Sequence, residues 1–276
     1  MMTGKTYMDG LDIFDEYQIF ITTGGYNSLI SFPPTKPART NDWPEYDGIE
    51  VDLSDQILDS KKLLIAFAGT GDGIESFVGN LAFPGAYHLF NFAEIGKIVN
   101  LRMISQQSFS QHAGLSIFSI EFADDFPLFE YTYNTPVSTV AAQGYTIDGK
   151  SLSDYGVSIL QGSDDEIAKS PVMKENLIRK FDGRSGLIYD NDFAKFKSKE
   201  VVLFCLLTAD TISEFWQNYN ALLFDLIKPG ERTLYEPKTG KTIKFYYKRS
   251  SVSAFYPDGK VWCQFSITLE FPSFRT

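Results

Sequence analysis

The feature that most constrains this sequence is an internal repeat. Six stretches in the first half of the 276-residue chain correspond, in the same order, to six stretches in the second half. Spacing between them changes only at turns and loops. Because an ordered series of matches is the signature of a repeated structural unit, the sequence predicts two tandem modules. We expect residues 1–127 to form the first module, 128–143 a linker and 144–276 the second module.

The longest match aligns "LLIAFAGTGDGIESF" (63–77) with "VVLFCLLTADTISEF" (201–215) without a gap. Each stretch is an apolar, strand-like run followed by apolar residues at helical spacing, which predicts a strand and then an amphipathic helix. Asp72 with Glu75, and Thr211 with Glu214, have the spacing of a capping box. Both helices are expected to end at Pro-Gly turns, Pro84-Gly85 and Pro229-Gly230.

The other matches lie on either side of this strand and helix. "DGLDIFDEYQI" (9–19) corresponds to "DGKSLSDYGV" (148–157), with Tyr17 on Tyr155, and each is followed by a loop containing an Asp-Gly turn, "PEYDGIEVDL" and "RKFDGRSGLI". After the helix, Gly96-Lys97 and Gly240-Lys241 mark the turns of two hairpins. The closing strands alternate in polarity, which predicts half-buried strands; their apolar positions are Phe118, Ile120 and Phe122 in the first half and Phe265, Ile267 and Leu269 in the second.

The composition favours strands over helices. The chain holds 3 Trp, 15 Tyr and 24 Phe, and aromatic residues are enriched in sheets. We therefore predict an α+β protein that is mainly β, with two tandem β-sandwich or barrel-like modules, each flanked by one α-helix. Cys205 and Cys263 lie in apolar, strand-like runs and are expected to be buried thiols.

A glycine-rich stretch, "AFAGTGDGIESFVGN" (66–80), has the outline of a phosphate-binding loop. The repeat argues against that function, because Gly69, Gly71 and Gly73 correspond to Leu207, Ala209 and Thr211. No Lys-Ser or Lys-Thr follows, and the glycine spacing does not fit a dinucleotide-binding motif. We predict no cofactor here, and assign the shared pattern to a strand, a cap and a helix.

Other candidates for chemistry have simpler explanations. The two histidines are His88, at a hairpin start where the second half has Thr233, and His112, at a turn; neither has the spaced partners of a metal set. The acid pairs Asp124-Asp125 and Asp164-Asp165 are expected to flank turns as solvated charges. We therefore predict no catalytic, cofactor-binding or metal-binding residues.

Two aromatic stretches, "FEYTYN" (129–134) and "KFYYKRSS" (244–251), have the composition to stack on sugars or bases. In strands, alternate aromatics more often face a core or a partner subunit. Lys244, Lys248 and Arg249 make the second stretch modestly basic, which fits a salt-rich surface at least as well as a polyanion site.

The charge is distributed unevenly. Residues 1–138 hold 7 Lys+Arg and 18 Asp+Glu, whereas residues 139–276 hold 18 and 17. An acidic half does not provide the clustered cations that nucleic-acid binding requires. The start "MMTGKTYMDG" lacks the features of a secretory signal, and no run reaches the length of a membrane helix. We expect a cytoplasmic protein without membrane contact.

The order of strand, capped helix, Pro-Gly turn, hairpin and alternating final strand resembles the tail-tube and distal-tail proteins of tailed bacteriophages. Residues 145–271, with the opening "IDGKSLSDYGV", carry the resemblance best. It implies β-sandwich modules packed side by side into a ring around a DNA channel, with no catalytic residues. Two modules per chain imply a trimer with pseudo-sixfold symmetry, as in baseplate hubs, or a hexamer with one module outside the ring.

From this resemblance we expect a structural component of a phage or prophage tail, a distal-tail, hub or tube-adaptor protein, that contacts other tail proteins. It would be assembled in the bacterial cytoplasm and reside in the virion tail, and DNA would pass through it without specific binding. Acidic channel walls would favour such passage, and we expect the acidic first half to contribute more of the lumen. The alternatives are a non-enzymatic β-sandwich that binds carbohydrate or a host surface and, third, an enzyme.

Overall fold

The fold is described by a computed structural model covering residues 5–22, 24–71, 73–127, 132–175, 178–189 and 194–273. Asp72, the expected cap of the first helix, lies outside the described residues. So do residues 128–131, which include the first half of "FEYTYN".

Each half of the chain forms one seven-stranded antiparallel sheet, and the two sheets have the same strand order. The orders are β2-β1-β7-β8-β9-β6-β3 and β11-β10-β16-β17-β18-β15-β12. The first sheet comprises β1 (Thr6–Met8), β2 (Leu11–Asp12), β3 (Ile19–Ile21), β6 (Lys61–Thr70), β7 (His88–Phe92), β8 (Lys97–His112) and β9 (Leu115–Asp124). The second comprises β10 (Thr146–Ile147), β11 (Lys150–Ser151), β12 (Val157–Ile159), β15 (Lys199–Ala209), β16 (Arg232–Glu236), β17 (Lys241–Tyr256) and β18 (Val261–Phe271).

One long strand in each module belongs to two layers. Residues 97–101 of β8 pair with β7, and residues 102–112 pair with β9. In the second module, residues 241–245 of β17 pair with β16, and residues 246–256 pair with β18. Apolar side chains from both layers meet in the core: Phe90 of β7 packs edge-on against Phe122 of β9 in the first module, and Leu234 of β16 and Leu269 of β18 are fully buried in the second. The prediction of two tandem, mainly β sandwich modules is confirmed.

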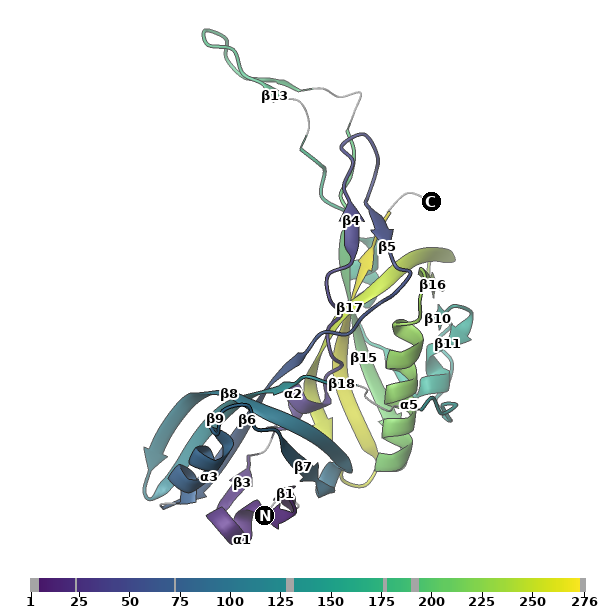
Figure 1. Ribbon diagram of the computed structural model, residues 1–276. Helices are drawn as coiled ribbons and strands as arrows, with labels where there is room; N and C mark the ends of the chain where they lie inside the picture. The colour runs from purple at the N-terminus through teal and green to yellow at the C-terminus, as the bar shows by residue number, and fades with distance from the viewer. Residues whose placement is uncertain are drawn as a thin grey trace.

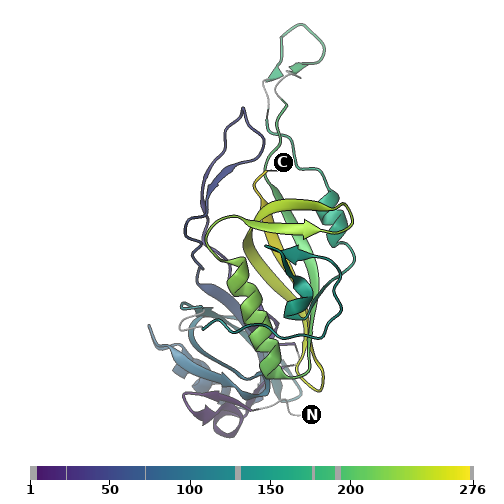
Figure 2. The ribbon, with the colours of Figure 1, turned by 90° about the vertical axis from the view of Figure 1, so that its right-hand side faces the viewer.

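One longer helix covers each module, as the apolar spacing predicts. These are α3 (Gly73–Leu81) and α5 (Ile212–Leu226), and Figure 2 shows α5 lying across the strands of the second module. Phe77 and Phe215 are fully buried at equivalent positions. Thr211 caps α5 by accepting a hydrogen bond from the Glu214 amide at 3.1 Å, while the Glu214 carboxylate accepts from the Asp210 amide instead of closing the box on Thr211 itself.

Shorter helices complete the modules. The α-helices are α1 (Ile13–Tyr17), α2 (Asn27–Ile30) and α4 (Ser163–Ala168), and the 3-10 helices are η1 (Ala93–Ile95) and η2 (Leu152–Tyr155). α1 and η2 carry the matched Tyr17 and Tyr155, both buried. The sequence did not predict α2 or α4, which have fewer than two turns.

The strand ladders define which positions of the two modules are equivalent. Leu63 pairs with Phe122, and Val201 pairs with Leu269, in agreement with the gapless match of 63–77 with 201–215. The ladders correct two other matches. His88 pairs with Leu101 and Arg232 pairs with Phe245, so His88 is equivalent to Arg232 rather than Thr233. Because Thr40 pairs with Val51 and Ile178 with Tyr189, Gly48 is equivalent to Gly186 rather than to the Gly183 of the Asp-Gly turn.

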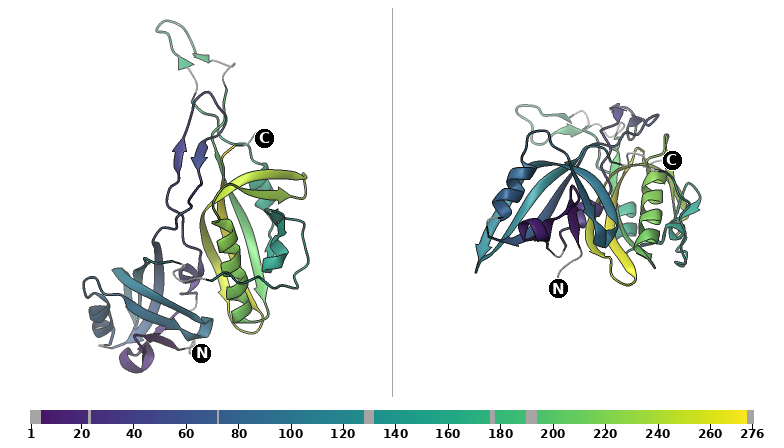
Figure 3. Two further views of the ribbon diagram at one scale, coloured as in Figure 1. Left: turned by 45° about the vertical axis from the view of Figure 1, so that its right-hand side comes forward. Right: turned by 60° about the horizontal axis from the view of Figure 1, so that its bottom comes forward.

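An extended arm leaves each module before its long central strand. The first arm carries β4 (Arg39–Asn41) and β5 (Glu50–Asp52), and the second carries β13 (Ile178–Arg179) and β14 (Ile188–Tyr189). Figures 1 and 3 show both arms at the same end of the molecule, with the second reaching furthest from the body. Single bridges close the bases of the arms, Thr35 to Leu58 and Met173 to Phe196.

Residues 132–143 of the expected linker contain no helix or strand and lie along the second module. Asn218 of α5 accepts from the Val137 amide at 2.8 Å and donates to the Val137 carbonyl at 2.7 Å. Tyr133 and Tyr155 both donate to Asp225. Over the described residues, no helix has the length and apolar character needed to cross a membrane.

Candidate assembly interface

The principal contact between the modules is made by residues 27–35, which we name the first docking segment. It comprises α2 and the extended residues that follow, and it lies on the second module along β17. The amide of Phe32 donates to Ser250 Oγ at 2.7 Å, and the amide of Thr35 donates to the Lys248 carbonyl at 2.9 Å. Asn27 Nδ2 donates to the Ser253 carbonyl at 3.1 Å. In this stretch β17 pairs with β18 on one side only, so the first docking segment covers an otherwise open sheet edge.

Phe32 inserts into the core of the second module. Its side chain is 3% exposed and stacks on Tyr219 of α5, with ring centroids 4.0 Å apart. Tyr247 and Phe265 meet the same ring edge-on, a geometry that aromatic pairs favour. The Tyr247 hydroxyl donates to the Pro33 carbonyl at 2.8 Å, and burial raises the pKa of Tyr247 far above its usual value, which keeps this donor protonated.

A second contact joins the hairpin of the first module to α5. Trp216 Nε1 donates to the Ile95 carbonyl at 2.5 Å, and Lys97 Nζ lies 4.8 Å from the centre of the Trp216 ring. An ammonium at this distance is attracted to the face of an indole. Trp216 therefore anchors the first module by both its N–H and its ring.

The first arm packs against the base of the second. The Gly48 amide donates to the Phe196 carbonyl at 2.8 Å, and the Ile49 amide donates to the Pro272 carbonyl at 2.9 Å. A Cβ at Gly48 would lie 1.9 Å from Pro272 O, and its φ is +76°, so only glycine fits. Lys174, buried at the base of the second arm, donates to the carbonyls of Trp43 and Gly48, each at 2.7 Å.

A buried lysine fixes each short helix at equivalent positions. Lys61 Nζ donates to the carbonyls of Leu29 and Ser31 at 2.5 Å, and Lys199 Nζ donates to the Ile167 carbonyl at 2.7 Å. Burial is the main cause that lowers the pKa of Lys61 to about 7 and that of Lys199 to about 8. Through its two hydrogen bonds, Lys61 attaches the first docking segment to the first module.

The first module presents the equivalent of the β17 surface to solvent. Residues 106–112 of β8 are all exposed, and Ile104 and Phe109 are 38% and 57% exposed. Between this strand and α3 lies a cavity of about 530 Å³, lined by residues that include Ile74, Val78, Gln106 and Phe109. We name residues 103–112 of β8, with this cavity, the open edge.

The glycines of "AFAGTGDGIESFVGN" have steric explanations. A Cβ at Gly73 would lie 2.1 Å from the Tyr17 carbonyl oxygen, and one at Gly69 would lie 2.9 Å from the Ile19 side chain. Gly71 has a φ of +71° at the turn into α3. The stretch is thus a tight strand-to-helix junction packed against α1 and β3.

His88 and Asp125 have structural partners, whereas His112 is exposed. His88 Nδ1 lies 2.7 Å from Asp9 Oδ2, and the equivalent Arg232 pairs with Asp148 at 3.1 Å. His112 is exposed at the end of β8. Asp125 binds Arg102 at 2.9 Å and Tyr87 at 2.7 Å, and the Arg102 hydrogen bond is the main cause that lowers the pKa of Asp125 to about 2. The described ranges contain no group of three His, Cys, Asp or Glu placed to hold a metal ion.

The basic stretch "KFYYKRSS" is matched by acids. Lys248 pairs with Glu200 and Glu270, Arg249 pairs with Glu200 at 3.0 Å, and Lys244 pairs with Glu231 at 2.8 Å. Phe245 and Tyr247 point into the core and are fully buried. This stretch therefore has the salt-rich outer face that the sequence suggested. Cys205 and Cys263 are buried free thiols, as expected, and burial raises the pKa of both.

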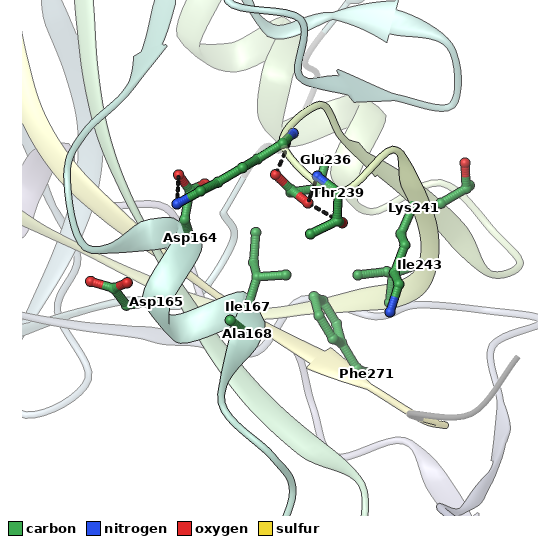
Figure 4. A pocket seen from close by; sticks show the side chains of 11 residues that line it. Asp164, Asp165, Ile167, Ala168, Glu236, Thr239, Lys241, Ile243 and Phe271 are labelled. Atoms are coloured by element: carbon green, nitrogen blue, oxygen red, sulfur yellow. Dashed lines mark hydrogen bonds and ion pairs between the residues drawn. The ribbon is translucent and has the colours of Figure 1, made fainter.

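The second acid pair borders a pocket of about 490 Å³ in the second module (Figure 4). Ile167, Ile243 and Phe271 form its apolar floor, and Asp164 and Glu236 stand on its wall. Glu236 already accepts from the amides of Lys238 and Thr239 at 2.6 and 2.9 Å. In the first module, the positions equivalent to Asp164, Glu236 and Thr239 hold Tyr26, Phe92 and Ile95, which are buried. The pocket is therefore not a feature shared by both modules.

No pattern in the sequence identified Phe32, Thr35 or Trp216 as interface residues. One signal was present: "SFPPTK" (31–36) and "KSPVMK" (169–174) share a proline and a lysine at the same spacing from Lys61 and Lys199. The predicted absence of a catalytic residue in these segments stays a prediction.

No family model matches the chain. No curated protein matches it either. Among solved structures, the chain is similar to the SPP1 Dit (gp 19.1) protein, described as a paradigm of the hub adsorption apparatus in phages that infect Gram-positive bacteria. The similarity has a TM-score of 0.36 at 10% identity and covers 97% of this chain and 98% of that chain.

Proposed function

We propose that this protein is a non-enzymatic structural component of a phage or prophage tail that assembles into a ring around a DNA channel. The single observation that carries the proposal is the contact between its modules. The first docking segment of one module lies on the sheet edge of the other, so the contact is head-to-tail, and contacts of that type generate rings when the rotation closes. The residue pattern that resembles tail-tube and distal-tail proteins supports the proposal that this ring belongs to a tail.

The two-module organisation sets the expected stoichiometry. With residues 1–127 and 144–276 as copies of one ancestral module, three chains make a ring with pseudo-sixfold symmetry, whereas a hexamer leaves one module per chain outside the ring. The excess of 18 Asp+Glu over 7 Lys+Arg in residues 1–138 favours the first module as the main contributor to a lumen through which DNA passes without binding.

Mass photometry and negative-stain electron microscopy of the purified protein, over a range of concentrations, test the proposal. We expect closed rings with a central opening wide enough for a DNA duplex and no retention of DNA fragments in a filter-binding assay. Compact oligomers without an opening, or rings that bind DNA tightly at physiological salt, would contradict it. A protein that stays monomeric but binds glycans would support the carbohydrate-binding alternative.

A further inference from the structure

We infer that the open edge of one chain receives residues 165–173 of a second copy, which we name the second docking segment. This inference rests on the proposed function and names the surfaces through which the copies would join. The contact within the chain is the model for this inference, because the first docking segment lies on β17. The equivalents of these two surfaces, residues 165–173 and the open edge, both face solvent.

The two docking segments match position by position. Each ends at a bridge to the strand that returns from its arm, Thr35 to Leu58 and Met173 to Phe196. Each includes a proline, Pro33 and Pro171, and each is fixed by a buried lysine, Lys61 or Lys199. The backbone hydrogen bonds at the base of each arm are also equivalent. The amide of Lys36 donates to the Ile57 carbonyl, and the amide of Lys174 donates to the Lys195 carbonyl.

The exposed apolar side chains on the second docking segment lie where contact is expected. Val172 and Met173 are 71% and 44% exposed. Met173 is equivalent to Thr35 of the first docking segment, whose amide donates to the Lys248 carbonyl. The bonds of the Met173–Phe196 bridge are made by the amides of Lys174 and Lys197, which leaves the Met173 amide directed away from that pair.

The two receiving strands match at the inferred bond and differ beyond it, where the second irregularity lies between Gln106 and Ser108 in β8 and between Val252 and Ala254 in β17. β8 and β17 each have an irregularity at the same place in the ladder, between Met103 and Ser105 and between Tyr247 and Arg249. The residues at these irregularities, Ile104 and Lys248, are therefore equivalent. Since the Lys248 carbonyl accepts from Thr35 within one chain, the Ile104 carbonyl is placed to accept from Met173 of a second copy. An open strand edge of this kind is a template for pairing with another chain.

Side-chain sizes are complementary in both contacts. Within the chain, the large Phe32 lies beside Ser250 on β17, and its ring meets Phe265, the ladder partner of Val252. Between copies, the small Ser170 takes the position of Phe32, while the receiving strand carries Gln106 and the larger Phe109 at the positions of Ser250 and Val252. The exposed Phe109 thus places on the receiving strand an aromatic side chain of the size that Phe32 provides on the docking segment, and it stands where β17 has the smaller Val252.

The two arms also have equivalent positions, of which, among the described residues, one is in contact and the other is free. Gly48, at φ +76°, packs against Pro272, whereas the equivalent Gly186, at φ +91°, has no atom near its Cβ position. Leu187 and Ile188 beside it are 50% and 53% exposed. In the inferred contact, the second arm of one copy lies on the first module of the next copy. The equivalents of the two observed arm bonds are then a bond from the Gly186 amide to the Leu58 carbonyl and a bond from the Leu187 amide to the Asp125 carbonyl. Both contacts place the nearly neutral second module against the acidic first module, which avoids juxtaposing two acidic surfaces.

A pair of engineered cysteines tests the inference in the full chain. The double variant I104C/M173C places thiols where the inferred bond joins the two backbones, and residues joined in this way have Cα atoms about 5 Å apart, within disulfide range. The matched control is T35C/K248C, which sits on the observed contact and forms a disulfide within one chain. The mismatched control is L64C/M173C, in which Leu64 is 48% exposed on β6. The native Cys205 and Cys263 are buried and do not compete.

After mild oxidation at concentrations where mass photometry detects oligomers, we expect I104C/M173C to lose its monomer band on non-reducing gels and to yield cross-linked multimers. An equimolar mixture of the single variants I104C and M173C should stop at a heterodimer. If oligomers form while I104C/M173C cross-links no more than L64C/M173C, the inference is wrong and the ring proposal stands. If no oligomer and no cross-link form at any concentration, both are contradicted.

Discussion

Phe32 is the side chain that most firmly joins the two modules, because it crosses from one into the aromatic core of the other. Removing a buried phenylalanine costs about 3–5 kcal/mol. We expect F32A to lower the free energy of unfolding by that amount in urea titrations. Its matched control is F109A at the exposed, equivalent surface, which should change stability by less than about 0.5 kcal/mol. Equal effects of the two variants would show that the contact is not maintained in solution.

Lys61 makes stability depend on pH in a defined direction. The pKa of Lys61 is about 7 in the fold against 10.5 for an ordinary lysine. Above pH 7 the unfolded chain therefore retains a proton that the folded chain releases, and the free energy of unfolding rises with pH by up to about 1.4 kcal/mol per unit. Urea midpoints at pH 7 and 9 should rise in the wild type more than in K61M. A parallel change in both would contradict this assignment.

Single residues show what the sequence could predict and what it could not. Phe118, Phe122 and Phe265 were predicted as buried because period-2 alternation reports which face of a strand is apolar. Phe32 lies in a segment with no regular period, so no local pattern marks it as part of another module's core. The contact depends on two surfaces more than 180 residues apart in sequence, Phe32 and Tyr219.

At the level of elements, the arms offer a matched pair of glycines. Gly48 and Gly186 both have positive φ, so alanine strains the backbone at each by a similar amount, about 1–2 kcal/mol. Only Gly48 has a neighbour that the new Cβ would strike. We expect G48A to destabilise the monomer clearly more than G186A in urea unfolding. Hydrogen exchange should increase at the Gly48 and Ile49 amides in G48A and should be unchanged at those amides in G186A.

The same elements show the limits of alignment by sequence. The long strands and helices aligned correctly because their apolar spacing is maintained over many residues. The arms misaligned because an Asp-Gly pair occurs in both, and only the ladder places Gly48 opposite Gly186. The helices α2 and α4 escaped prediction because four to six residues provide too little periodicity to distinguish a helix from a loop.

At the scale of the whole molecule, the chain contains one head-to-tail contact and the two surfaces needed for another. When the rotation between successive modules closes, repetition of one contact forms a ring without requiring a new type of interface. The acidic first module and the nearly neutral second module would then alternate around the ring. This arrangement connects the repeat in the sequence, the equivalent docking segments and the proposed channel in one account.

The most direct test is a cryo-EM reconstruction of the assembled protein, in which the contact between chains is compared with the contact inside each chain. The account predicts that residues 165–173 of each copy lie on β8 of the next, with the Met173 amide on the Ile104 carbonyl, around an open channel. An assembly in which β8 faces solvent, or in which chains meet first module to first module, would contradict it.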